Sequence, residues 1–144
     1  NKIAVVDRTS RKVIATWDVT AAKDNVSMGL DEPDHRLFVA AREPGMLLVL
    51  DSENGKVVAS VPSVGGVDDL AYDVQRKRIY MSGAEGFVNV YQQKDADTYE
   101  SLGKIPTGAG ARNSKFIPEQ NRLYVAVPAG KGKPAEVQVY EVNP

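Results

Sequence analysis

Three polar side chains recur at matching places along the chain, and their types are suited to binding a cation or a polar ligand. Ser27, Asp69 and Asn113 are separated by 42 and then 44 residues. Oxygens from carboxylates and amides are ligands that Ca²⁺ prefers, so Asp69 and Asn113 are candidate metal ligands and Ser27 offers a further oxygen. A divalent cation held there would polarise the carbonyl of a substrate. The same residues are also expected beside a water-filled channel that binds nothing.

The residues one position earlier add charge to this group. They are Asp68 and Arg112, with Val26 as the third member. This pair predicts contacts with a ligand. The alternative is that Asp68 or Asp69 only pairs with Arg112 or caps a turn. An acid–base pair of Asp68 and Asp69 is not expected, because adjacent strand residues point to opposite faces unless a bulge intervenes. The candidate ligand-binding residues are therefore Asp68, Asp69, Arg112, Asn113 and Ser27.

The composition argues against several other kinds of chemistry. The chain has no Cys and a single His, His35, so it contains neither a Cys–His catalytic pair nor a Cys/His zinc site. No serine lies in a G-x-S-x-G context, and no glycine motif for phosphate or dinucleotide binding occurs. The formal charge of −1 argues against a nucleic-acid partner. No apolar run approaches the roughly 20 residues of a membrane span.

A repeated strand motif predicts the elements that position the candidate residues. Arg36-Leu-Phe-Val-Ala40 returns as Arg78-Ile-Tyr-Met-Ser82 and Arg122-Leu-Tyr-Val-Ala126, at steps of 42 and 44 residues. Each copy is followed by a second apolar alternation, and the members of this second series are 3–7, 47–51, 88–92 and 137–141. A period of roughly 40–45 residues made of short strands is typical of β-propeller blades, each of which is a four-stranded sheet.

The order of the predicted strands defines the expected fold. With the strands of a blade lettered A (inner) to D (outer), the chain should run C-D, A-B-C-D, A-B-C-D, A-B-C. We therefore expect an all-β fold: a β-propeller fragment of about three four-stranded antiparallel blades, forming one domain over 1–144. The end of one blade is expected in 1–24, blades in 25–65 and 66–110, and an incomplete last blade in 111–144. The A strands would line a central channel, with the candidate residues near its mouth.

The blade pattern resembles the YVTN-repeat family of bacterial β-propellers. The matching segments are Arg122-Leu-Tyr-Val125, Ile3-Ala-Val-Val-Asp7, Arg11-Lys-Val-Ile-Ala-Thr16 and Gly55-Lys-Val-Val-Ala-Ser-Val61. The resemblance implies a seven-bladed ring, an extracytoplasmic (periplasmic or secreted) location, and a chain equivalent to the C-terminal half of a longer member. It transfers no catalytic motif. The family's signature Asn, two positions after the Tyr-Val pair, is replaced by Ala41, Gly83 and Val127.

These observations predict a non-catalytic binding or scaffold module that holds an unknown small molecule or protein at the channel mouth. One alternative is a lactonase-like hydrolase that uses a divalent cation, with Ca²⁺ as the candidate, at the same mouth. A second alternative is a structural half-propeller that closes by homodimerisation. An incomplete terminal blade exposes a sheet edge that invites association. We therefore expect either a homo-oligomer or further N-terminal blades to cover that edge.

Overall fold

Thirteen β-strands and one short 3₁₀ turn make up the chain in the computed structural model, which describes residues 1–143. The strands are rich in β-branched and aromatic residues, which favour a pleated strand over a helix. The all-β prediction is confirmed. Pro144, at the end of the predicted last blade, lies outside the described residues. The elements are β1 (Lys2–Asp7), β2 (Lys12–Asp18), β3 (Lys23–Asp31), β4 (Arg36–Glu43), β5 (Gly45–Asp51), β6 (Val57–Pro62), β7 (Val67–Asp73), β8 (Arg78–Gly83), β9 (Phe87–Gln93), β10 (Tyr99–Pro106), β11 (Asn113–Ile117), η1 (Pro118–Gln120), β12 (Arg122–Val127) and β13 (Glu136–Glu141).

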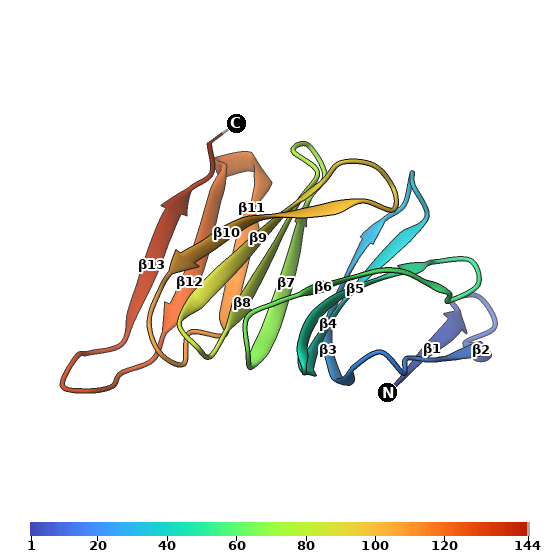
Figure 1. The fold of residues 1–144 in the computed structure, drawn as a ribbon, viewed down its shortest axis with the longest axis horizontal. Coiled ribbons are helices and arrows are strands. Elements are labelled where there is room, and N and C mark those ends of the chain that lie inside the picture. Colours follow the sequence, from blue (N-terminus) through green and yellow to red (C-terminus); the bar gives the residue numbers. More distant parts are fainter. Residues whose placement is uncertain (144) are drawn as a thin grey trace.

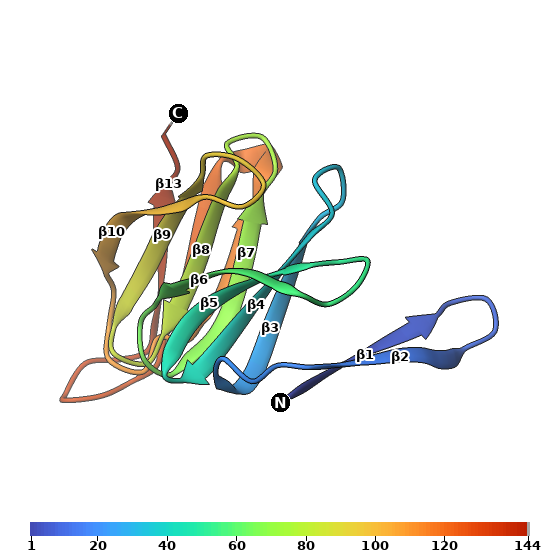
Figure 2. The same ribbon diagram turned by 45° about the vertical axis from the view of Figure 1, so that its right-hand side comes forward.

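Neighbouring strands in the sequence pair with each other, and they form four antiparallel sheets (Figures 1 and 2). The first sheet is the β1–β2 hairpin. Blade 1 is the sheet β3-β4-β5-β6, blade 2 is β7-β8-β9-β10, and blade 3 is the three-stranded sheet β11-β12-β13. Short turns join most of the strands, because consecutive antiparallel strands need only a tight hairpin connection.

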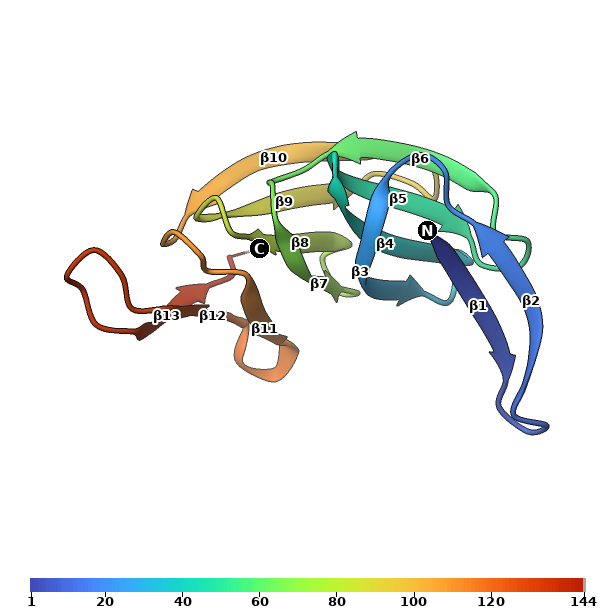
Figure 3. The ribbon, with the colours of Figure 1, turned by 90° about the horizontal axis from the view of Figure 1, so that it is seen from below.

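The sheets stand side by side as an arc. Seen from below, the inner strands β3, β7 and β11 follow one side of the arc, and the outer strands β6 and β10 follow the opposite rim (Figure 3). Blades 1 and 2 therefore each present one face to the preceding sheet and one to the following sheet. We call the face toward the following sheet the front face.

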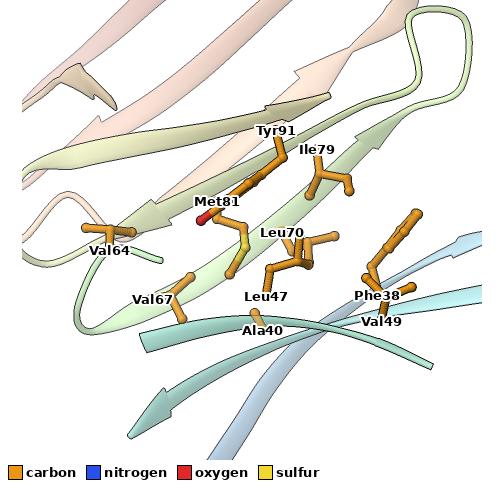
Figure 4. Close-up of a cluster of buried hydrophobic side chains, with 10 residues drawn as sticks. All are labelled: Phe38, Ala40, Leu47, Val49, Val64, Val67, Leu70, Ile79, Met81 and Tyr91. Carbon is orange, nitrogen blue, oxygen red and sulfur yellow. The ribbon is translucent and has the colours of Figure 1, made fainter. Parts of the chain in front are cut away.

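The hydrophobic core lies between the sheets. The largest cluster fills the space between blades 1 and 2, where Phe38, Leu47 and Val49 from the front face of blade 1 meet Ile79 and Tyr91 of blade 2 (Figure 4). A second cluster joins the β1–β2 hairpin to blade 1, and a third joins blade 2 to blade 3. A single sheet has no core of its own, so every blade depends on its neighbours for burial.

The turn between the first two strands of each blade has a repeated backbone conformation. His35, Lys77 and Asn121 occupy the same place in the three blades, with left-handed φ angles of 52°, 51° and 51°. His35 therefore lies in an exposed turn, and its side chain is 60% exposed. Among residues 1–143 its side chain has one partner, Glu53 at 3.8 Å, which fits a turn residue.

Burial between blades should make equivalent positions differ greatly in their contribution to stability. Leu47 and Val137 occupy the same position in blades 1 and 3, but Leu47 is 0% exposed and Val137 is 63% exposed. We expect Leu47→Ala to lower the free energy of unfolding by about 2–5 kcal/mol. Val137→Ala should change it by less than about 0.5 kcal/mol. Denaturant unfolding measures both values, and equal losses would contradict a core that lies between blades.

Candidate functional site

The candidate residues lie where the inner strands begin. We call this end of the sheets the mouth end. The connections β6–β7 and β10–β11 reach this end, as do the turns β4–β5, β8–β9 and β12–β13. Figure 3 shows the arc from the mouth end. The structure thus brings the beginnings of β7 and β11 next to each other, with β3 on the other side of β7.

Ser27 and Asp69 each bond to the backbone of the next inner strand. The Leu70 N–H of β7 donates to Ser27 Oγ at 3.2 Å, and the Ser114 N–H of β11 donates to Asp69 Oδ2 at 2.9 Å. We call these two hydrogen bonds the inner-strand ties. Asn113 is the third member of the series, and its Nδ2 donates to Asp69 Oδ2 at 3.4 Å. The predicted register is therefore real, but the first two oxygens satisfy backbone N–H groups.

A β-bulge separates the roles of the adjacent carboxylates. The pairing register shifts between Val67 and Asp69, so Asp68 is an extra residue in β7. A matching bulge lies between Asn25 and Ser27 in β3. Bulges re-aim side chains at strand ends, and here Asp68 and Asp69 have different partners.

Asp68 lies between two arginines from the flanking blades. Arg42, at the mouth end of β4, forms an ion pair with Asp68 Oδ1 and donates from Nε to the Val67 carbonyl at 3.0 Å. On the other side, Arg112 Nη1 lies 3.8 Å from Asp68 Oδ2. The side chain of Asp68 is 21% exposed, and that of Arg112 is 48% exposed. A pair with Arg112 is one of the options predicted from the sequence. The sequence also places the turn of Arg42 at the channel mouth, but the pairing of Arg42 with Asp68 depends on how blades 1 and 2 pack.

Two open hollows adjoin Asn113 and the β12–β13 loop. One, of about 530 Å³, is lined by Gly110, Asn113 and Glu136, among others. The other, of about 390 Å³, lies between Gly108 and the two lysines Lys131 and Lys133. The loop between β12 and β13 projects from the arc (Figure 1). The mouth end of blade 3 therefore combines open space with cationic side chains.

A second polar cluster lies at the opposite end of the inner strands and was not predicted. The buried Asp31 carboxylate accepts from the Tyr72 hydroxyl at 3.1 Å and from Gln93 Nε2 at 2.8 Å. Burial, with the nearby Asp31 charge second, raises the pKa of Tyr72. These residues come from both blades 1 and 2, so the cluster holds the two sheets together. Its only signal in the sequence is a carboxylate at the end of an inner strand.

The donor set for a cation is small. Within residues 1–143, no group of three or more His, Cys, Asp or Glu side chains lies close enough to hold a metal ion. Of the two predicted metal ligands, Asp69 and Asn113, only Asp69 is a carboxylate. Its Oδ2 already accepts the Ser114 N–H. The predicted Ca²⁺ site at Asp69 and Asn113 therefore stays a prediction.

Comparison with known proteins shows similarity in fold. No protein-family model matches the chain, and no curated protein matches it in sequence. The structure superposes on a hydrazine synthase of Kuenenia stuttgartiensis with a TM-score of 0.84 and 14% identity, covering 97% of this chain and 40% of that chain. It superposes on the Dos1 propeller with a TM-score of 0.65 and 13% identity, covering 86% of this chain and 32% of that chain.

This is a β-propeller fold. A third neighbour is a candidate 6-phosphogluconolactonase from Bacteroides uniformis, with a TM-score of 0.68, 14% identity, and coverage of 90% of this chain and 44% of that chain. The chain thus spans less than half the length of each of these three proteins. At such identities the likeness shows the fold alone, and the resemblance to YVTN-repeat propellers stays a prediction.

The inner-strand ties should contribute to the stability of the propeller arc. We expect Asp69→Ala to lower the free energy of unfolding by about 1–3 kcal/mol, because the Ser114 N–H loses its acceptor. Asp69→Asn keeps an oxygen at this position and should cost less. Glu32→Ala removes an exposed carboxylate and serves as the control in denaturant unfolding. Equal effects of Asp69→Ala and Glu32→Ala would argue against a structural role for Asp69.

The Ca²⁺ hypothesis makes a separate prediction. A cation bound at Asp69 and Asn113 stabilises only the folded chain, by about 2.7 kcal/mol at a concentration of 100 Kd. Saturating CaCl₂ should then raise the Tm of the wild-type chain, and the increase should disappear in Asp69→Ala. Thermal unfolding with CaCl₂ and with a chelator measures this, and an unchanged wild-type Tm would eliminate the site.

Proposed function

We propose that this propeller arc, a single domain over 1–144, is a non-catalytic binding module that holds an anionic group at the mouth end. The observation that carries the proposal is the convergence of Arg42 and Arg112 on the single carboxylate of Asp68. Both guanidinium groups face this one carboxylate, because the neighbouring Asp69 carboxylate accepts the Ser114 N–H instead.

Arg112 is the residue best placed to contact a ligand. Its guanidinium is about half exposed and lies 3.8 Å from Asp68, whereas Arg42 makes the close contacts with Asp68 and Val67. A guanidinium presents a planar set of N–H donors that matches a carboxylate or phosphate with two parallel hydrogen bonds. In this proposal Asp68 orients Arg112, and Arg112 contacts the ligand.

The other predicted contact residues have supporting roles. Ser27 and Asp69 accept backbone N–H groups of neighbouring inner strands, which holds the strands that carry Asp68 and Arg112. Lys131 and Lys133 line a hollow at the same end of blade 3, together with the carboxylate of Glu136. The proposed ligand is therefore a small carboxylate or phosphate compound, or an acidic segment of a protein.

The other predictions about function are tested separately from anion binding. The lactonase-like alternative requires a divalent cation at Asp69 and Asn113, so the CaCl₂ experiment decides it independently of anion binding. No helix in residues 1–143 is long and apolar enough to cross a membrane. The seven-bladed ring and the extracytoplasmic location rest on the YVTN resemblance and stay predictions.

Anion binding can be measured with simple probes. We expect inorganic phosphate and succinate to bind the chain, and Arg112→Gln to weaken that binding about tenfold or more. This loss corresponds to one charged hydrogen-bonding contact of about 1.5–3 kcal/mol. Arg8→Gln makes the same charge change in the β1–β2 turn, which is distant in the sequence from Asp68 and Arg112. This control should leave the affinity unchanged. Isothermal titration calorimetry at low ionic strength is the measurement, since salt screens exposed charges.

Two results would contradict the proposal. The first is an equal response of the wild-type chain, Arg112→Gln and Arg8→Gln, which would mean that phosphate and succinate act only through net charge. The second is a loss of affinity in Arg8→Gln that exceeds the loss in Arg112→Gln, which would mean that the anion binds away from the mouth end.

A further inference from the structure

The turn between β5 and β6 contains the one Asn-Gly pair of the chain, Asn54–Gly55. An Asn followed by Gly is prone to close on itself as a cyclic imide, because glycine has no side chain to keep its backbone nitrogen away from the Asn Cγ. Asn54 is exposed, so water and hydroxide reach it. This turn is therefore a place where the backbone could modify its own side chain.

The β1–β2 turn has the same backbone conformation with a different sequence. In the β5–β6 turn the Gly55 N–H donates to the Asp51 carbonyl at 2.8 Å. In the β1–β2 turn the Arg11 N–H donates to the Asp7 carbonyl at 2.7 Å. Gly55 and Arg11 have left-handed φ angles of 76° and 57°. The β1–β2 turn forms with Ser-Arg where the β5–β6 turn has Asn-Gly, so the conformation itself requires neither an Asn nor a Gly.

A contact from another sheet explains the glycine. The indole ring of Trp17, in β2, lies so close to Gly55 that a Cβ added to Gly55 would overlap the ring carbons. Trp17 also packs against the hydrophobic cluster that joins the β1–β2 hairpin to blade 1. Arg11, the equivalent of Gly55 in the β1–β2 turn, is exposed. The backbone next to Asn54 is therefore covered by a side chain of the docked hairpin.

The hydrogen bonds of the β5–β6 turn have opposite effects on imide formation. Asn54 Oδ1 accepts the Lys56 N–H at 2.9 Å, and this donor stabilises the negative charge that develops on the oxygen when a nucleophile attacks Cγ. The Gly55 N–H is held by the Asp51 carbonyl, although its nitrogen must lose that proton before it can attack. The folded turn thus prepares the electrophile and withholds the nucleophile until the turn opens locally.

We propose that Asn54 is a deamidation site whose reaction is suppressed while Trp17 covers Gly55. When the hairpin moves away and the turn opens, the Gly55 nitrogen loses its proton to hydroxide and bonds to Asn54 Cγ. The Cγ–Nδ2 bond breaks, and the leaving nitrogen takes a proton from water and departs as ammonia. The resulting succinimide is opened by water to aspartate or isoaspartate. This inference does not depend on anion binding at Arg112.

The product changes the turn permanently. Deamidation adds a carboxylate close in sequence to Asp51 and Glu53, and like charges in one turn repel each other. The isoaspartyl product also lengthens the backbone within the turn. Both changes disfavour the return of Gly55 beneath Trp17. The modification therefore records that the β1–β2 hairpin has left blade 1.

Peptide mapping by mass spectrometry measures the deamidation rate at position 54 in the intact chain at mildly alkaline pH. We expect Asn54 of the folded wild-type chain to react about tenfold or more slowly than Asn54 of the chain unfolded in guanidinium chloride, because the folded reaction requires local opening. Trp17→Ala should raise the folded rate toward the unfolded rate. Asn54→Ser introduces the residue type of the β1–β2 turn and should abolish the signal at this position.

The β1–β2 turn provides a matched control within the folded chain. Ser10→Asn combined with Arg11→Gly places an Asn-Gly pair in an exposed turn that has the same backbone hydrogen bond. Position 10 of this double variant should deamidate about tenfold or more faster than position 54 of the same molecules, because Trp17 covers only the second pair. The double variant keeps Trp17, so this comparison holds even if Trp17→Ala unfolds the hairpin.

The outcomes separate the site from its protection. A folded rate at Asn54 below the unfolded rate, with faster reaction at position 10 of the double variant, supports the proposal. Equal rates at positions 10 and 54 of that variant would show that Trp17 gives no protection, and the suppression would be refuted. If Asn54 stays unmodified in the unfolded chain, the deamidation site itself is wrong.

Discussion

The burial of apolar side chains between neighbouring sheets is the constraint on which the rest of this structure depends. A blade of four short strands has too little thickness to enclose a core, so its side chains reach their buried state only against another blade. Leu47 and Ile79 belong to different sheets but to one cluster. The repeated sequence pattern follows from this constraint, because each sheet must offer complementary faces on both sides.

The polar contacts are arranged around that packing. Adjacent inner strands belong to different sheets, so the N–H groups on their facing sides have no regular strand partner. An unpaired backbone donor in a partly buried position is costly, and the side-chain oxygens of Ser27 and Asp69 accept two of these donors. Ser27 and Asp69 therefore have a structural role at the junctions between blades. At the end of the sheets opposite the mouth end, arginine side chains also join neighbouring sheets. Arg36 donates to Asp97 of blade 2, and Arg78 donates to the Asn143 carbonyl of blade 3.

Much of the fold was readable from the sequence because its signals are local. The alternation around Phe38, Tyr80 and Tyr124 predicts strands directly, and its spacing predicts the blades. The candidate site was less accessible, because it depends on three-dimensional detail. The register of Ser27, Asp69 and Asn113 was predicted correctly, but the bulge that re-aims Asp68 adds an extra residue in β7, which no local pattern marks. The Arg42–Asp68 pair joins residues of two blades, and only their packing brings them together.

In a repeat protein, structural residues can be distinguished from functional residues by comparing the blades with one another. Residues that serve the stacking of sheets must recur, as do the arginines at 36, 78 and 122 and the aromatic residues two positions later. The charged group at the mouth end does not recur. Asp68 is replaced by Val26 and Arg112 in the other blades, and Arg42 is replaced by Ala84 and Pro128. The junction between the β1–β2 hairpin and blade 1 forms without any of these charges. The proposed anion site therefore rests on a group of charges that interrupts the repeat, at the end of the sheets where open hollows lie.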